Sequence, residues 1–138
     1  MPYRLAVLTT LMNPPTIQAM LTAAAKNADR LDADLTMIVA TVGCLDMPVI
    51  ADYLLRKKNI DGLVVLGAVA QGDTDHDEVV VETMTLTIVQ LSVKLRKPVG
   101  FGVIGPGAKP QQFAARTNSY AQRAVAAVVT NLNILRGR

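Results

Sequence analysis

The residue best suited to acid–base chemistry is His76, the only histidine in the chain. An imidazole gains and loses protons near neutral pH, which makes it a candidate proton shuttle. The alternative is a solvated or helix-capping histidine beside the acidic residues Asp75, Asp77 and Glu78. We expect no metal site from these four side chains, because adjacent residues at the start of a helix diverge around its axis.

His76 ends a segment, residues 67–76, that leads from an apolar run into a helix-like pattern. Within it, Gly72 permits close approach of the backbone to a ligand, and Thr74 supplies a hydroxyl. The amides around Gly72 to Asp75 would lie at the N-terminus of the following helix. Such amides can hold a phosphate without a cationic side chain. A Gly-Asp-Thr sequence at a helix start is also common as plain capping, so the segment by itself leaves both interpretations open.

Three further side chains could serve a site. Asp46 follows an apolar run and could accept hydrogen bonds from ligand hydroxyls, or it could cap the next helix. Cys44 is the only cysteine, which excludes an internal disulfide and is typical of a reducing compartment. Nothing beside it in sequence activates its thiol, which favours a packing role. Arg116 follows Phe113-Ala114-Ala115 and could lie at the surface or clamp a phosphate.

Apolar runs of strand length alternate with segments of helical period, and these elements must position the side chains above. The predicted strands are residues 5–9, 35–40, 63–66 and 99–104. The second of them is apolar on both faces, as in the interior of a parallel sheet. The first predicted helix runs from Asn13, an expected N-cap followed by two prolines, to residue 31. The other three run from Asp46 to residue 59, over an apolar stripe at residues 80–95, and from residue 111 almost to the C-terminus.

This βαβαβαβα order predicts one domain over residues 1–138, an α/β fold with a parallel sheet between layers of helices. Ligands bind such sheets at the carboxyl ends of the strands, near a switch in strand order. Residues 10–13, 42–46, 67–76 and 105–109 follow those ends. We therefore expect these four loops to share one edge of the sheet.

Composition narrows the classes of partner. Although 51% of the residues are hydrophobic, no apolar run approaches the roughly 18 residues that cross a bilayer. We expect no membrane association and, without a signal-peptide cleavage region, a cytoplasmic location. The excess of apolar residues favours surface buried between subunits. The net charge of +3 is mild, and three Tyr, two Phe and no Trp offer little surface for stacking bases, which argues against nucleic-acid binding.

Three motifs together resemble those of the lumazine synthase family. Residues 67–76, Gly-Ala-Val-Ala-Gln-Gly-Asp-Thr-Asp-His, resemble its signature, in which Gly-x-Val-x-x-Gly-x-Thr-x-His leads from a strand end into a helix. Residues 42–48, Val-Gly-Cys-Leu-Asp-Met-Pro, are similar to its Val-Pro-Gly-x-Phe-acid-x-Pro element. Residues 97–103, Lys-Pro-Val-Gly-Phe-Gly-Val, and an arginine in the next helix also match. The motifs occur in order, cover essentially the whole chain, and look most like archaeal members.

The resemblance implies a flavodoxin-like three-layer α/β/α sandwich with a four-stranded parallel sheet. It implies an enzyme of riboflavin biosynthesis that condenses 5-amino-6-(D-ribitylamino)uracil with 3,4-dihydroxy-2-butanone 4-phosphate and releases phosphate, with no metal or organic cofactor. By this resemblance His76 transfers protons and Arg116 supplies the countercharge of the phosphate. The implied substrate-binding residues are Met12, Asn13, Cys44, Leu45, Asp46, Ala68, Val69, Ala70, Gly72, Asp73, Thr74, Phe101 and Arg123.

The same resemblance distributes these residues over the two substrates. Gly72, Asp73 and Thr74 would hold the phosphate, and Arg123 would fill a late basic position. The remaining contacts divide between the ribityl chain, for Asn13, Leu45 and Asp46, and the pyrimidine ring, for Ala68, Val69 and Phe101.

Active sites in this family lie between adjacent subunits of a ring of five, so the resemblance implies pentamers, either alone or joined into a sixty-subunit shell. Phe101 and Arg116 would then reach the pocket of a neighbour. The chain departs from the pattern at Met12 and Leu45, where the family has aromatic residues, and at Val42, where it has proline. Two alternatives remain open. One is an archaeal-type riboflavin synthase, which does not keep the Gly-Asp-Thr-x-His loop, and the other is a non-catalytic scaffold of this fold or a flavin- or pterin-binding protein.

Overall fold

The computed structural model describes residues 1–72 and 76–138, and it shows the alternation of strands and helices that the sequence predicts. The strands are β1 (Tyr3–Thr10), β2 (Ala33–Thr41), β3 (Gly62–Ala70) and β4 (Val99–Ala108). The α-helices are α1 (Pro14–Arg30), α2 (Met47–Leu55), α3 (His76–Leu95) and α4 (Phe113–Leu135). Short 3-10 helices, η1 (Cys44–Asp46) and η2 (Pro110–Gln112), precede α2 and α4.

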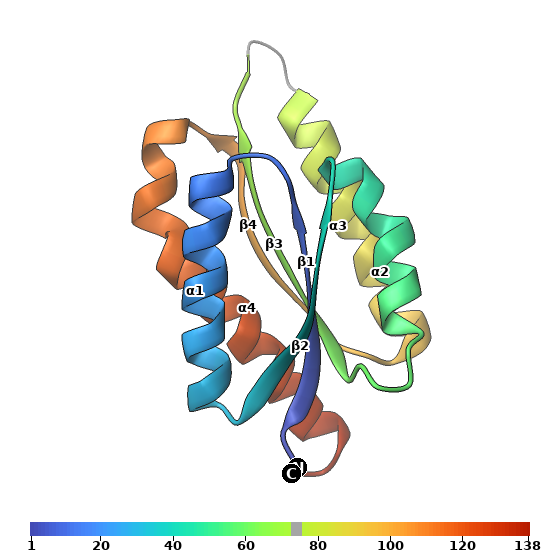
Figure 1. Ribbon diagram of the computed structural model, residues 1–138. Helices are drawn as coiled ribbons and strands as arrows, with labels where there is room; N and C mark the ends of the chain where they lie inside the picture. The colour runs from blue at the N-terminus through green and yellow to red at the C-terminus, as the bar shows by residue number, and fades with distance from the viewer. Residues whose placement is uncertain (73–75) are drawn as a thin grey trace.

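The strands form a parallel sheet in the order β2-β1-β3-β4. Helices α1 and α4 cover one face of the sheet, and α2 and α3 cover the other (Figure 1). This arrangement confirms the predicted three-layer α/β fold with four parallel strands. The strand order reverses between β1 and β3, so the carboxyl ends of these two strands border the crevice where ligands bind in such sheets.

Strand β2 is half-exposed, which corrects the expectation that it is buried on both faces. Its inner positions alternate between exposed and half-buried residues, and the Ile38 side chain is 54% exposed. The cause is its place at the edge of the sheet, where β1 alone pairs with it among the described strands. The local apolar pattern does not encode that place.

Strands β3 and β4 both extend beyond their predicted ends. Ala70 is paired with Ala108, and the Gln71 N–H donates to the Ala108 carbonyl at 2.7 Å. The two strands approach closely at Gly105, where φ is +113° and an added Cβ would lie 2.6 Å from the Val69 carbonyl oxygen. The predicted loop at residues 105–109 is therefore part of β4 as far as Ala108.

Helix α2 ends at Leu55, earlier than the pattern predicts. The Lys57 N–H donates to the Leu54 carbonyl, and the Ile60 N–H donates to the Lys57 carbonyl, so the chain turns at once toward β3. Lys97, which lies between α3 and β4, donates from Nζ to the Lys57 carbonyl at 2.7 Å. The Lys57 carbonyl therefore accepts two hydrogen bonds, one from the turn that follows α2 and one from a lysine 40 positions away.

Helix α4 packs directly on the backbone of β4, because Gly100 and Gly102 have no side chains. A Cβ at Gly100 would lie 2.0 Å from the Ala124 carbonyl oxygen, and one at Gly102 would lie 2.8 Å from that of Tyr120. This contact fixes α4, whose first turn carries Arg116, against the sheet.

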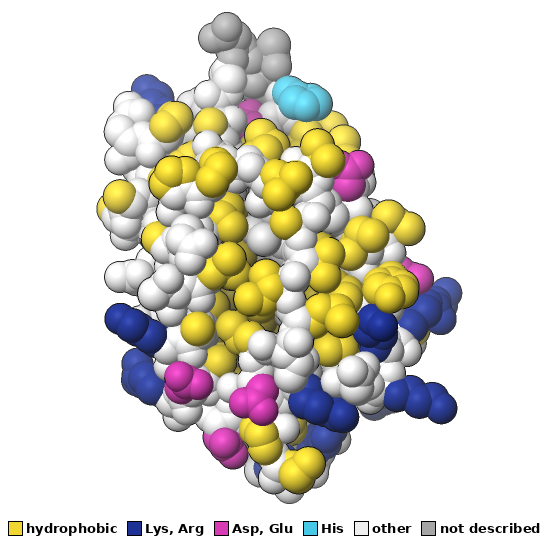
Figure 2. Space-filling view, in the orientation of Figure 1, with side chains coloured by type: hydrophobic (Ala, Val, Ile, Leu, Met, Phe, Trp, Pro, Cys, Tyr) yellow, Lys and Arg dark blue, Asp and Glu magenta, His cyan; other side chains and the backbone are white. Residues whose placement is uncertain are grey.

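Large apolar side chains remain exposed over α2 and α3, and Figure 2 shows hydrophobic side chains spread over much of the face it presents. On α3, the exposed residues Val79, Leu86 and Val93 recur at seven-residue spacing, so they form a stripe along the helix. Val49 and Tyr53 extend this apolar surface onto α2. None of the described helices combines the length and apolarity that a bilayer crossing requires.

Candidate active site

Asn13 lies at the switch point of the sheet and joins its two central strands. Its backbone is in the left-handed region, with φ of 54°, which asparagine tolerates better than most residues. Its Nδ2 donates to the Ala68 carbonyl near the end of β3 at 2.7 Å. Asn13 is the N-cap residue of α1, as predicted, but its side chain makes no capping hydrogen bond there.

The loops after β1 and β2 present apolar side chains to solvent at this same edge. Leu11, Met12, Val42 and Leu45 are each about half or more exposed, from 48% to 73%. The two loops are joined, since the Leu11 N–H donates to the Thr41 carbonyl at 2.9 Å. Exposed aliphatic groups beside a crevice can cover a planar ring, and the Met12 thioether adds a polarizable sulfur.

Asp46 holds the loop after β2 in shape. Its Oδ2 accepts a hydrogen bond from the Gly43 N–H at 3.0 Å, so the carboxylate closes η1 and does not cap α2 through its side chain. Asp46 is exposed, which leaves its carboxylate accessible to a ligand. Cys44 is buried in the core, and burial raises the pKa of its thiol, which keeps it protonated and agrees with a packing role.

His76 is the first residue of α3 and is exposed at the carboxyl edge of the sheet (Figure 2). Gly72 is also exposed, and among the described residues nothing lies within 4 Å of a Cβ added to it. The partial positive charge of a helix N-terminus favours an anion here. The predicted phosphate contacts of Asp73 and Thr74 lie outside the described residues.

The last three residues of β3, Ala68 to Ala70, point to different faces of the sheet. Ala68 and Ala70 face the layer of α1 and α4, whereas Val69 faces that of α2 and α3. The Ala68 side chain is buried in the core, and its carbonyl oxygen accepts the hydrogen bond from Asn13. Val69 and Ala70 are half-buried.

Within one chain the structure does not bring Phe101 or Arg116 to His76. Phe101 pairs with Val65, in the middle of β3, and is half-buried against the α2–α3 face. Arg116 is half-buried on α4, on the opposite face of the sheet from α3. Arg123 is exposed further along α4, with its guanidinium 5.7 Å from the centre of the Tyr120 ring.

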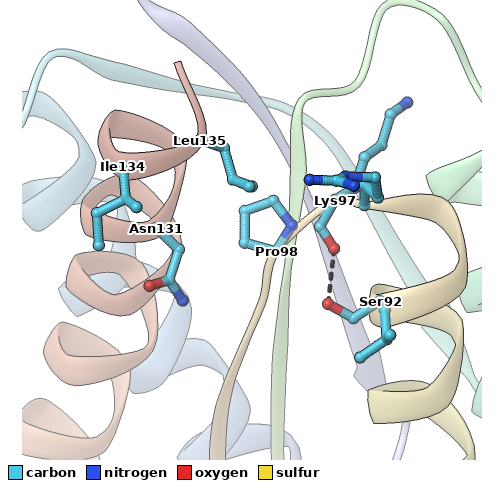
Figure 3. Close-up of a pocket in the computed structure, with 8 residues that line it drawn as sticks. Ser92, Lys97, Pro98, Asn131, Ile134 and Leu135 are labelled. Atoms are coloured by element: carbon cyan, nitrogen blue, oxygen red, sulfur yellow. Dashed lines mark hydrogen bonds between the residues drawn. The ribbon is translucent and has the colours of Figure 1, made fainter. Parts of the chain in front are cut away.

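An apolar hollow lies at the other end of the molecule, between the C-terminal ends of α3 and α4 (Figure 3). It has a volume of about 390 Å³ and is lined by Pro98, Asn131, Ile134 and Leu135, among others. The Ser92 hydroxyl on its wall donates to the Lys97 carbonyl at 2.8 Å and so closes the end of α3. No residue predicted for the site lines it, so it is not part of the candidate active site.

The sequence did not predict the role of Asp77, which follows His76 at the candidate site. Asp77 is buried, and its Oδ2 accepts a hydrogen bond from the Gly107 N–H at 2.8 Å. No spacing pattern signals this bond, because it depends on how α3 packs against the end of β4. Among the residues that the structure describes, no group of three or more His, Cys, Asp or Glu side chains is arranged to hold a metal ion.

Comparison with known proteins matches nearly the whole chain to one family. The family model described as 6,7-dimethyl-8-ribityllumazine synthase matches residues 2–136. A protein of Pyrobaculum arsenaticum named 6,7-dimethyl-8-ribityllumazine synthase is 41% identical over 126 residues, which are 91% of this chain and 84% of that protein. A protein of the same name from Saccharolobus islandicus is 40% identical over 126 residues, 91% of this chain and 82% of its own length.

Proposed function

This chain belongs to the 6,7-dimethyl-8-ribityllumazine synthase family, and we propose that the family's reaction takes place at the carboxyl edge described above. The protein is a transferase of riboflavin biosynthesis. It condenses 5-amino-6-(D-ribitylamino)uracil with 3,4-dihydroxy-2-butanone 4-phosphate to 6,7-dimethyl-8-ribityllumazine and releases phosphate and water. The observation that carries this conclusion is the family match over residues 2–136, which includes every residue of the candidate site.

Proton transfer in this reaction falls to His76. Imine formation, phosphate elimination and ring closure each move protons between nitrogen, carbon and oxygen, for which one imidazole is suited. Its exposed place at the N-terminus of α3 supports this role. The phosphate binds beside it, at Gly72, Asp73 and Thr74, and Arg116 supplies the countercharge.

The pyrimidine and its ribityl chain occupy the switch point between β1 and β3. Met12 and Leu45 cover the ring with aliphatic rather than aromatic surface, and their exposure at this edge supports that contact. Asp46 accepts hydrogen bonds from ribityl hydroxyls through its exposed carboxylate. Asn13 shapes the crevice instead of donating freely, because its amide is bound to the Ala68 carbonyl. Binding both substrates side by side makes the condensation effectively intramolecular.

The site is completed by a second copy of the chain. Phe101 and Arg116 do not reach His76 within one chain, and a ring of five subunits lets a neighbour supply them. The exposed apolar stripe at Val79, Leu86 and Val93 of α3 supports such an assembly, because water-exposed apolar stripes are stabilised when helices pack together. Twelve rings can close into a sixty-subunit shell. We place the protein in the cytoplasm, which its free cysteine supports.

The test is to supply both substrates to the purified protein and to follow the fluorescent lumazine and the released phosphate, with a protein-free reaction as control. We expect both products in equal amounts. Riboflavin formed from lumazine alone would instead assign the protein to the riboflavin synthases. Binding of lumazine or a flavin without formation of either product would mark a non-catalytic scaffold.

A further inference from the structure

Asp77, the second residue of α3, has an environment unlike that of its neighbours. It is 6% exposed, whereas His76 and Glu78 on either side are exposed. A buried carboxylate is unfavourable unless it accepts hydrogen bonds. Its Oδ2 accepts one from the Gly107 N–H at 2.8 Å, a charge-assisted bond between a helix start and a strand end. A carboxylate in the first turn is also favoured by the partial positive charge of the helix N-terminus.

Among the described residues, two hydrogen bonds tie the active-site segment to the end of β4, and the bond from Gly107 to Asp77 is the second of them along the chain. The chain leaves β3 at Gln71, whose N–H donates to the Ala108 carbonyl at 2.7 Å. It enters α3 where Asp77 binds Gly107, the residue before Ala108. Both ends of the segment that leads to His76 are therefore held on adjacent residues of one strand.

The end of β4 is itself fixed, so it can serve as an anchor. Gly105 lies so close to β3 that an added Cβ would stand 2.6 Å from the Val69 carbonyl oxygen. Ala108 is buried in the core under α1 and α4. A hydrogen bond to Gly107, between these two residues, therefore holds the first turn of α3 in a defined place relative to the sheet.

We propose that Asp77 is a positioning residue for the reaction, whose bond to Gly107 sets where the His76 imidazole stands relative to the ends of β3 and β4. The inference rests on the proposed proton-transfer role of His76. Asp77 does not touch substrate in this view, because its side chain is buried and directed at β4. Displacement of a catalytic group by about 1 Å lowers turnover by as much as a hundredfold, so loss of this bond should lower kcat more than it changes KM.

The test measures kcat and KM for four variants and a double variant in the assembled enzyme. Asp77→Leu keeps the size but removes the acceptor, and we expect kcat to fall about tenfold with KM changed by less than about threefold. Asp77→Asn keeps an amide oxygen that accepts from Gly107, and it should stay within about twofold of wild type. Glu78→Leu, the matched exposed neighbour, should do the same. In a His76→Ala background, Asp77→Leu should cause no further loss.

Two outcomes would overturn the inference: an equal loss of kcat from Asp77→Leu with and without His76, or a loss in Asp77→Asn as large as in Asp77→Leu. If Asp77→Leu does not fold, Asp77→Ala replaces it. Hydrogen exchange of the Gly107 amide gives a readout that needs no turnover, with protection expected in wild type and Asp77→Asn and lost in Asp77→Ala. Absence of lumazine formation by the wild type would refute the proposed function but leave the exchange result able to decide the bond.

Discussion

Replacement of Gly100 by alanine should push α4 away from the sheet. The added Cβ would stand 2.0 Å from the Ala124 carbonyl oxygen and 2.9 Å from Cγ2 of Val128. Real Cβ atoms essentially never approach closer than 3.0 Å, so α4 or β4 must move by at least 1.0 Å at this point. The obstacle is backbone rather than a flexible side chain, which excludes relief by a change of rotamer.

The rest of α4 resists that movement. Gly102 also packs on the helix backbone, since a Cβ there would lie 2.8 Å from the Tyr120 carbonyl oxygen, one turn earlier along α4. Ala121, Ala124 and Val128 are fully or almost fully buried against β4 and α1. Overpacking a well-filled core costs about 1–3 kcal/mol. Because the strained contact is backbone to backbone, we expect the upper end, a loss of about 3 kcal/mol in the free energy of unfolding. For a chain of this size that corresponds to a fall in Tm of about 10 °C.

Gly72→Ala is the matched control, since it adds the same methyl group where no described atom lies within 4 Å. Its Tm should stay within about 2 °C of wild type, because surface substitutions usually change stability by less than about 0.5 kcal/mol. Its KM for the phosphate substrate should rise, because the methyl occupies space that a close-lying phosphate needs. Calorimetry of both variants at one protein concentration separates the effects. A Tm for Gly100→Ala within 2 °C of the control would refute the packing argument.

Three further predictions concern charge, catalysis and assembly. Burial alone would raise the pKa of Asp61, but hydrogen bonds from the Arg4 N–H and the Arg136 guanidinium outweigh it and hold that pKa below its usual value. Such stabilisation is present above about pH 4 and is lost as pH falls through the lowered pKa. Asp61→Asn should therefore reduce Tm at neutral pH and make the loss of stability in acid smaller. Thermal melts of both proteins across pH measure this difference. His76→Ala should slow turnover severalfold to about a hundredfold, because positioning supplies much of the rate, and a loss above about 10⁴-fold in steady-state assays would contradict this. Leu86→Lys should dissociate the assembly in sedimentation velocity and remove activity, whereas Ala25→Lys on exposed α1 should do neither.

The order and type of the elements were predictable because their signals are local. Apolar runs of strand length indicated all four described strands, and the inward residues of α4, such as Val125 and Leu132, recur at the spacing of a helix face. The ends of β3 and β4 were not predictable, because the pairing of Ala70 with Ala108 joins segments far apart in the chain. The exposure of β2 likewise follows from strand order rather than from its own residues.

In the candidate site, too, the features set by local sequence were predictable and those set by long-range contacts were not. The place of His76 at a strand end before a helix follows from residues near it in sequence. The bond from Asn13 to the Ala68 carbonyl spans 55 positions, and that from Gly107 to Asp77 spans 30. Asparagine before a helix favours a capping hydrogen bond from its side chain, but in Asn13 the tertiary contact with Ala68 takes the place of that bond. The Asn13 side chain bonds to the distant Ala68 carbonyl, because that carbonyl lies at the crevice between the central strands and needs a hydrogen-bond donor.

If the proposed roles of Phe101 and Arg116 hold, the positions of these residues make activity depend on assembly. Phe101 pairs with Val65, five residues before Ala70, which places it about 16 Å below the edge of the sheet at roughly 3.3 Å per residue. Arg116 lies on the layer of α1 and α4, with the sheet between it and His76. On the proposed roles, each of them acts on substrate held by another copy. Dissociation of the ring would therefore abolish turnover while every catalytic side chain stays intact on its own chain.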